Sequence, residues 1–157
     1  MKRAPKREFY YPGHGDKVYK WGQQTKAYPG GSEYTGQEMP PWIISIADHI
    51  RSEFGEEVNH AIAIRYSSGT ENFAPAHQDK IPAGTSFFVL SFGTPRNFQL
   101  LNGPPKKGGT VVWKKPLANG SLLVVSGELN RTHWHEVPKD KSWAGEARWS
   151  LIFRTIR

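Results

Sequence analysis

The chain has 157 residues, a formal net charge of +7 and no cysteine. That length suits one core with an internal pocket, so we expect a single domain over residues 1–157. Because cysteine is absent, the sequence excludes disulfides, thiolate-bound zinc, iron–sulfur clusters and cysteine nucleophiles, and any metal must be held by nitrogen and oxygen ligands.

No run of apolar residues is long enough for a signal peptide or a membrane span. The sequence therefore predicts a soluble intracellular protein, cytoplasmic or nuclear, and we expect it to be a monomer. Its positive charge comes with 13% aromatic residues. This pairing suits phosphate contacts and base stacking, although many basic domains bind no nucleic acid.

The first 40 residues are rich in Gly, Pro, Tyr and Lys and show little regular period, which is typical of turns and short strands. From Pro41 to Phe54 apolar residues recur at helical spacing. Prolines stand at the start of this segment and Gly55 follows its end. The pattern predicts a helix.

Beyond the helix the pattern becomes strand-like. Six short apolar runs are separated by Gly, Pro and Asn turns, at residues 61–66, 86–92, 97–101, 109–113, 121–126 and 149–154. A Lys-rich turn at residues 104–108 is expected to be a solvated hairpin tip. Strands of this kind predict a mainly β fold (α+β) with one or two helices, arranged as a two-sheet barrel or jelly roll.

His77 and Asp79 follow a segment, residues 67–76, that we predict to be a loop. Residues i and i+2 of an extended segment point to the same side, so both side chains can face one ion. A third ligand is available from His135 or from its neighbour His133. Two histidines and one carboxylate form the facial triad that binds non-haem iron(II) and leaves coordination positions open. An isolated His-x-Asp is more often a pair of surface residues in a loop.

Alternation along the last strand places Arg148, Ser150, Ile152 and Arg154 on one face. Two interpretations compete. In one, the arginines lie on the solvated face of a half-buried strand. In the other they point into the barrel, where a buried guanidinium is tolerated only when it is paired with an anion such as a dicarboxylate cosubstrate.

Together these motifs resemble the AlkB-like family of Fe(II)/2-oxoglutarate-dependent dioxygenases, from about Tyr34 to the C-terminus. The residues that carry the resemblance are Pro41-Trp42-Ile43, Asn59, Arg65 to Gly69, His77 to Lys80, Ser91-Phe92-Gly93, Arg96-Asn97-Phe98, Gly120 to Leu123, Thr132 to His135 with Pro138, and Arg148 to Arg154.

The resemblance implies a double-stranded β-helix in which three residues bind Fe(II) and form the catalytic centre: His77, Asp79 and His135. It also implies a 2-oxoglutarate site made by Arg148, Tyr66, Ser150 and Arg154. Arg148 would hold the distal carboxylate, and Arg154 would lie nearer the iron. The implied activity is oxidation by dioxygen of an alkylated or methylated base in DNA or RNA, with release of formaldehyde, as in DNA repair or RNA modification.

The segment between Lys17 and Gly36 resembles the nucleotide-recognition lid of that family. Lys17 and Tyr34 are therefore candidate substrate contacts, and Trp21 and Tyr28 are weaker ones, because each aromatic residue also suits a structural role. A duplex substrate would require the base to be flipped out of its stack.

Three positions depart from the family pattern. Ile64 and Ser150 stand where asparagine is usual near the cosubstrate. Ile81 is a candidate substrate contact that stands where repair members carry an acid that reads an exocyclic amino group. Because Ile81 cannot accept a hydrogen bond, the alternative substrates are a base without that group or a 5-methylpyrimidine that is hydroxylated without demethylation.

Two further functions compete with oxidation of a nucleic acid. The first is hydroxylation of a protein side chain or a small molecule by the same chemistry. The second is a nucleic-acid-binding barrel without catalysis, against which the intact triad and both arginines argue.

Overall fold

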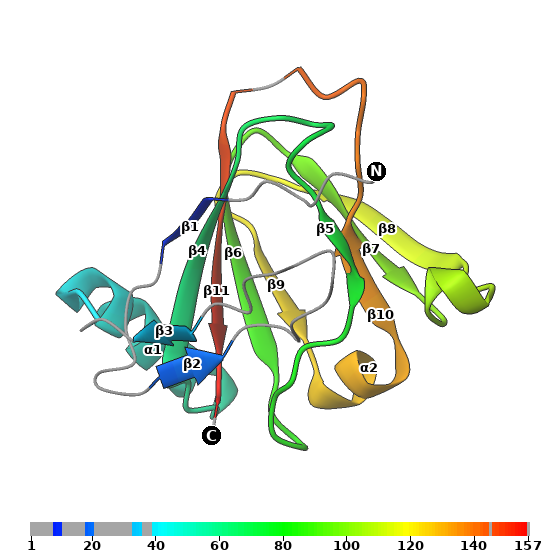
Figure 1. Cartoon of the computed structure of the whole chain (residues 1–157). Coiled ribbons are helices and arrows are strands. Elements are labelled where there is room, and N and C mark those ends of the chain that lie inside the picture. Colours follow the sequence, from blue (N-terminus) through cyan, green and yellow to red (C-terminus); the bar gives the residue numbers. More distant parts are fainter. Residues whose placement is uncertain (1–7, 11–17, 21–32, 36–38, 145, 157) are drawn as a thin grey trace.

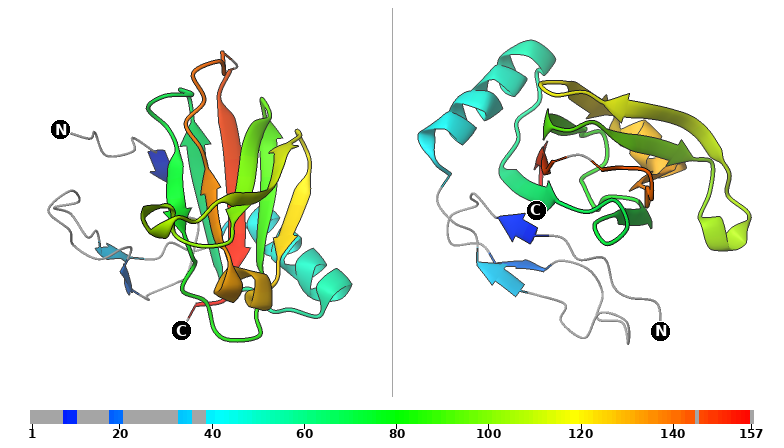
Figure 2. Two further views of the ribbon diagram at one scale, coloured as in Figure 1. Left: turned by 90° about the vertical axis from the view of Figure 1, so that its right-hand side faces the viewer. Right: turned by 90° about the horizontal axis from the view of Figure 1, so that it is seen from above.

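The computed structural model describes residues 8–10, 18–20, 33–35, 39–144 and 146–156. Two antiparallel sheets face each other, and a helix covers the outside of the larger one (Figures 1 and 2). Among the described residues no helix combines the length and the apolar character that crossing a membrane requires.

The larger sheet has five strands. In spatial order they are β1 (Glu8–Tyr10), β4 (His60–Tyr66), β11 (Arg148–Arg154), β6 (Phe87–Gly93) and β9 (Leu122–Val125). The smaller sheet has the order β5 (Ala74–His77), β10 (Trp134–Val137), β7 (Arg96–Leu101) and β8 (Val111–Leu117). A separate ribbon pairs β2 (Val18–Lys20) with β3 (Glu33–Thr35). From β4 onward the chain passes back and forth between the two main sheets, which confirms the predicted double-stranded β-helix.

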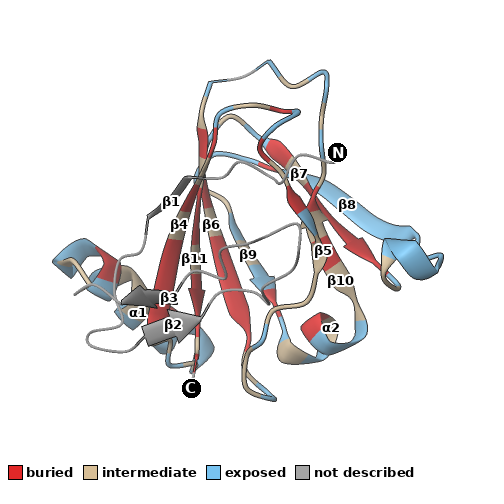
Figure 3. Ribbon diagram, viewed as in Figure 1, coloured by how far each residue is buried: buried red, intermediate tan, exposed pale blue. Residues whose placement is uncertain are grey.

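Helix α1 (Pro41–Phe54) has the predicted bounds. It begins with proline in the first turn and ends at Gly55, which has the left-handed conformation that favours glycine (φ 67°). Its buried residues Ile43 and Ile50 pack against Phe88 of β6 and Phe153 of β11. The helix therefore seals the outer face of the larger sheet. A second apolar cluster packs between the two sheets, and Figure 3 shows buried residues on strands of both sheets.

The six predicted strands all form, with shifted ends. The strand predicted over residues 109–113 begins at Val111 and runs through Pro116 to Leu117. Proline is tolerated there because β8 is an edge strand, where a missing N–H breaks no ladder on the open side. The Lys-rich turn is a short 3₁₀ helix, η1 (Pro105–Lys107), and is solvated as expected.

The prediction of a loop over residues 67–76 was wrong at its end, since β5 begins at Ala74. Strand β10 and the second helix, α2 (Gly127–Thr132), were not predicted either. Both missed strands have four residues and too little alternation to be recognised, and β5 contains Pro75. Helix α2 has a usable signal in Ser126, whose hydroxyl accepts a hydrogen bond from the Leu129 N–H.

Candidate metal centre and cosubstrate pocket

Strand β11 supplies one wall of a pocket between the sheets. The pocket is lined by alternate residues of this strand, Arg148, Ser150, Ile152 and Arg154. Arg148, Ser150 and Arg154 are at most 2% exposed. Leu151 lies on the opposite face and packs under α1. Of the two interpretations from the sequence, the structure therefore supports the one in which both arginines point inward.

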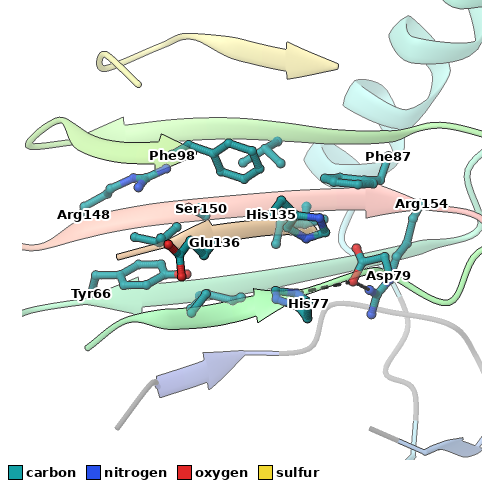
Figure 4. A pocket seen from close by; sticks show the side chains of 15 residues that line it. Tyr66, His77, Asp79, Phe87, Phe98, His135, Glu136, Arg148, Ser150 and Arg154 are labelled. Atoms are coloured by element: carbon teal, nitrogen blue, oxygen red, sulfur yellow. Dashed lines mark ion pairs between the residues drawn. The ribbon is translucent and has the colours of Figure 1, made fainter. Parts of the chain in front are cut away.

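Three potential metal ligands meet at one end of the pocket. His77 ends β5, Asp79 follows two residues later, and His135 lies directly opposite His77 on β10. The ligand atoms of all three lie within 4.8 Å of one another. Nδ1 of His77 is 2.7 Å from the Pro75 carbonyl oxygen, so as the donor in that bond it leaves Nε2 for a metal. This is a candidate facial triad (Figure 4).

His133, the alternative to His135, is not part of the cluster. It lies at the C-terminal end of α2, one residue before β10 begins, and its Nδ1 is 2.9 Å from the Thr132 hydroxyl. Among the described residues, the grouping with metal-binding geometry is His77, Asp79 and His135.

Two side-chain amides, those of Gln78 and Asn130, join α2 to the segment after β5 that carries Asp79, which we call the ligand loop. The Asn130 side chain accepts from the Asp79 N–H at 3.0 Å and donates to the Asp79 carbonyl at 2.9 Å. The Gln78 side chain donates to the carbonyls of Asn130 and Arg131 at 2.9 and 2.8 Å. These four bonds set the backbone position of a ligand without touching its carboxylate. The sequence gives little sign of this arrangement, because the partners are backbone groups.

Charges around the triad favour the forms that bind a metal. Nη1 of Arg154 forms an ion pair with Asp79 Oδ1 at 3.1 Å. Burial raises the pKa of Asp79, but Arg154, His135 and His77 outweigh it and the net pKa is lowered. Burial, with help from His77 and Arg154, lowers the pKa of His135 to about 3 against the opposing effect of Asp79. The carboxylate is therefore ionised and His135 neutral at physiological pH, as metal ligation requires.

Arg148 lies at the other end of the pocket, beside Tyr66 (Figure 4). Its Nη2 donates to the Ser91 hydroxyl at 3.0 Å, and the Tyr66 ring centre is 5.6 Å from its guanidinium carbon. Among the described residues, its Nε and Nη1 have no hydrogen-bond partner. Burial lowers the pKa of Arg148 to about 10, and nearby Arg96 adds to this while Tyr66 opposes it. A buried cation with open donors suits a carboxylate.

Between the two ends lie the positions that depart from the family pattern. Ile64 and Ser150 are directly opposite each other on β4 and β11, and both line the pocket. Ser91 is the partner of Ser150 on its other side. Ser91 is buried and contacts the pocket through its hydrogen bond with Arg148. This contact was not predicted, although strand alternation with Phe87 and Val89 places Ser91 on the inward face.

None of the candidate substrate contacts is among the described residues that line the pocket. Ile81 is partly buried and packs against the core between the sheets, and it is not among the residues that line the pocket. Lys17, Trp21 and Tyr28 lie outside the described residues. Tyr34 lies on β3, and its side chain is also outside them.

A jelly roll with this cluster at one end of its pocket and an arginine with open donors at the other is the architecture of a 2-oxoglutarate-dependent iron oxygenase. The family model of the 2OG-Fe(II) oxygenase superfamily matches residues 7–154, and the chain belongs to this superfamily.

Its relatives within the superfamily are AlkB homologues. The chain is 31% identical over 126 residues to the human protein named DNA oxidative demethylase ALKBH2, covering 74% of this chain and 48% of the relative. It is 28% identical over 136 residues to rat alpha-ketoglutarate-dependent dioxygenase alkB homolog 3, covering 80% and 45%. The chain thus spans about half the length of these relatives.

Solved structures support the fold. OsALKBH1 superposes with a TM-score of 0.57 at 18% identity, over 78% of this chain and 66% of that one. A 2OG-Fe(II) oxygenase family oxidoreductase from Burkholderia pseudomallei superposes with a TM-score of 0.52 at 15% identity, over 94% and 65%.

The superfamily implies Fe(II) and 2-oxoglutarate as cofactors, and the residues present fit both. Two imidazoles and a carboxylate suit Fe(II). The open donors of Arg148 suit the distal carboxylate of 2-oxoglutarate. When bound, the pair supplies oxidation by dioxygen coupled to decarboxylation of the cosubstrate.

Proposed function

We propose that this dioxygenase oxidises an alkylated or methylated base in DNA or RNA and demethylates it with release of formaldehyde. The observation that carries the proposal is one pocket with the triad at one end and the open guanidinium of Arg148 at the other, in a chain whose relatives are AlkB homologues. The net charge of +7 supports a polyanionic substrate.

In this proposal His77, Asp79 and His135 hold the iron. Arg148, with the Ser91 hydroxyl and Tyr66 beside it, would hold the distal carboxylate of 2-oxoglutarate. Arg154 keeps Asp79 ionised and in place through their ion pair.

Apolar side chains in the pocket keep water away from the proposed metal ligands. Phe87 and Phe98 pack against His135, with ring centres 4.9 and 5.6 Å from it. They exclude water on that side of the ligand, which strengthens the electrostatic interactions inside the pocket.

We propose Lys17 and Tyr34 as substrate contacts. We also propose that Ile81, which packs against a core cluster of which several residues line the pocket, influences the choice of base. An isoleucine cannot accept a hydrogen bond from an exocyclic amino group. This favours a base without that group, and it makes hydroxylation of a 5-methylpyrimidine the second candidate activity. Both reactions use the same iron site and differ in whether carbon is lost.

The test is mass spectrometry of a panel of methylated DNA and RNA oligonucleotides incubated with the protein, Fe(II) and 2-oxoglutarate. We expect a product lighter by one methylene group, with formaldehyde, for at least one N-methylated base. The second candidate predicts a product heavier by one oxygen. Asp79→Ala removes an iron ligand and is expected to abolish both the products and the turnover of 2-oxoglutarate without substrate. Full turnover by Asp79→Ala would overturn the assigned triad. Turnover on a protein or metabolite, with no oligonucleotide product, would overturn the proposed substrate class.

A further inference from the structure

One surface outside the pocket combines positive charge with an aromatic side chain. We call it the β8 edge and define it by Lys106 and Lys107 of η1 and Trp113, Lys114 and Lys115 of β8. All five residues are exposed. The first six residues of β8 are exposed on both faces of the strand, which Figure 3 shows as a continuous exposed band. This half of the hairpin contributes little to the core.

The charge of this region is not balanced locally. The sequence contains no Asp or Glu between Asp79 and Glu128. Within the part of the chain that the structure describes, none of the four lysines forms an ion pair. The field of the lysines therefore extends into solvent, where it attracts anions.

Strand register connects the β8 edge to the metal centre. His77 pairs with His135, His135 with Leu100 on β7, and Leu100 with Trp113 on β8. Residues that pair in this way across an antiparallel sheet point to the same face. The indole of Trp113 therefore lies on the face that carries both ligand histidines, three strands from His77. At about 4.8 Å per strand this is roughly 14 Å.

That separation suits a nucleic acid. Phosphates follow one another at about 3.4 Å of helix axis per strand in a duplex. Nucleotides a few positions from a base in the pocket would thus meet the β8 edge. The lysines are point cations suited to phosphate, and the exposed indole is suited to stacking on a base.

We infer that the β8 edge binds the phosphate backbone of the nucleic acid beside the nucleotide that enters the pocket. This inference rests on the proposed function, because it names how the same substrate is held outside the site. Lysines on an edge strand can also prevent it from pairing with another chain. That role requires no lysines in η1, and it makes a different prediction for the test.

The test is the salt dependence of oligonucleotide binding, measured by fluorescence anisotropy with Mn(II) in place of Fe(II) to prevent turnover. Single-stranded and duplex oligonucleotides are titrated against the full chain, Lys114→Gln, Lys115→Gln and the double variant Lys106→Gln/Lys107→Gln. The control is Arg51→Gln, which also removes one exposed positive charge but lies on α1, on the outside of the other sheet. Thermal unfolding checks that each variant folds.

For each phosphate that a variant no longer neutralises, the slope of log affinity against log salt should become shallower by about 0.7 on a single strand and about 0.9 on a duplex. We expect this for the β8-edge variants and an unchanged slope for Arg51→Gln. If the wild-type protein binds with a steep slope and the lysine variants keep it, the inference is wrong and the proposed function stands. Self-association of those variants at an unchanged slope would identify the lysines as protection of the strand edge. If the wild-type protein binds no oligonucleotide even at low salt, the proposed function itself fails.

Discussion

Arg96 and Arg148 flank the same tyrosine, are both 1% exposed and yet have different surroundings. Their guanidinium carbons lie 5.8 and 5.6 Å from the Tyr66 ring centre. Arg96 donates to four carbonyl oxygens, those of Ser68, Gly69, Asn72 and Pro138, at 2.8 to 3.5 Å, and it also lies 4.8 Å from the Trp143 ring centre. Arg148 donates to the Ser91 hydroxyl, while two of its nitrogens have no hydrogen-bond partner among the described residues.

This difference separates a structural cation from one that is suited to bind a ligand. The carbonyls around Arg96 belong to the loop after β4 and the segment after β10, so the side chain holds these two connections together. The protein leaves Arg148 only partly satisfied, at a cost in stability, because a buried cation without full hydrogen bonding is unfavourable. A carboxylate bound to Arg148 would remove that cost, and the gain would appear as affinity.

The largest effect on cosubstrate binding is expected when the planar guanidinium of Arg148 is replaced by an ammonium group. Arg148→Lys keeps the charge but cannot form two parallel bonds to a carboxylate. A hydrogen bond to a charged group contributes about 1.5–3 kcal/mol, so we expect the apparent KM for 2-oxoglutarate to rise roughly 10- to 150-fold. Steady-state turnover with varied 2-oxoglutarate, and then with varied oligonucleotide, measures this. An equal rise in both constants would contradict the assignment of Arg148 to the cosubstrate.

The free energy of unfolding should depend more on Arg96 than on Arg148. Arg96→Met leaves several buried carbonyls without a donor, each at about 1–3 kcal/mol, and should lower the free energy of unfolding by roughly 3 kcal/mol. Arg148→Met removes an incompletely satisfied cation, so it should leave that free energy unchanged or raise it. Urea unfolding of both variants without cosubstrate gives the comparison. Equal destabilisation would show that Arg148 is also structural.

A smaller effect is expected at the metal end of the pocket, where the supporting residue is Asn130. Asn130→Ala removes both bonds to the Asp79 backbone and should weaken metal affinity by about 10- to 100-fold, the usual cost of removing the support behind a ligand. Calorimetric titration with Mn(II) measures the affinity without turnover. Arg131→Ala in the same helix is the control, because only its backbone carbonyl contacts the ligand loop. Similar decreases in both variants would point to disruption of α2 instead of weaker support for Asp79.

Much of the fold was predictable because it follows from periodicity. The apolar spacing from Pro41 to Phe54 predicted α1 at its observed bounds, and six alternating runs predicted six strands. The two strands that were missed, β5 and β10, carry His77 and His135. Their formation depends on pairing partners distant in the sequence, since Leu100 and His77 lie on either side of His135. Local propensity does not encode such pairing.

The site was partly predictable for a similar reason. The His-x-Asp motif and the shared face of Arg148 and Arg154 follow from a two-residue period. That period left open whether the face of the two arginines points into the barrel, because the choice depends on which side of β11 the other sheet covers. Asn130 was not predicted, since its amide binds backbone groups that any residue would offer at position 79. The difference in hydrogen bonding between Arg96 and Arg148 could not be predicted from the sequence either, because it depends on the positions of the loop after β4 and the segment after β10.

The register of strand β11 also fixes how far apart its two arginines lie. All seven of its residues are paired on both sides, to β4 and to β6, so it cannot slide by one position without turning every side chain to the other face. Arg148 and Arg154 are therefore held six residues, or roughly 20 Å, apart. The same register fixes where each arginine side chain enters the pocket. It therefore sets the much shorter gap that a five-carbon cosubstrate held between Arg148 and the metal centre would have to bridge. We expect an oxo acid shortened by one carbon to reach only one of the two ends.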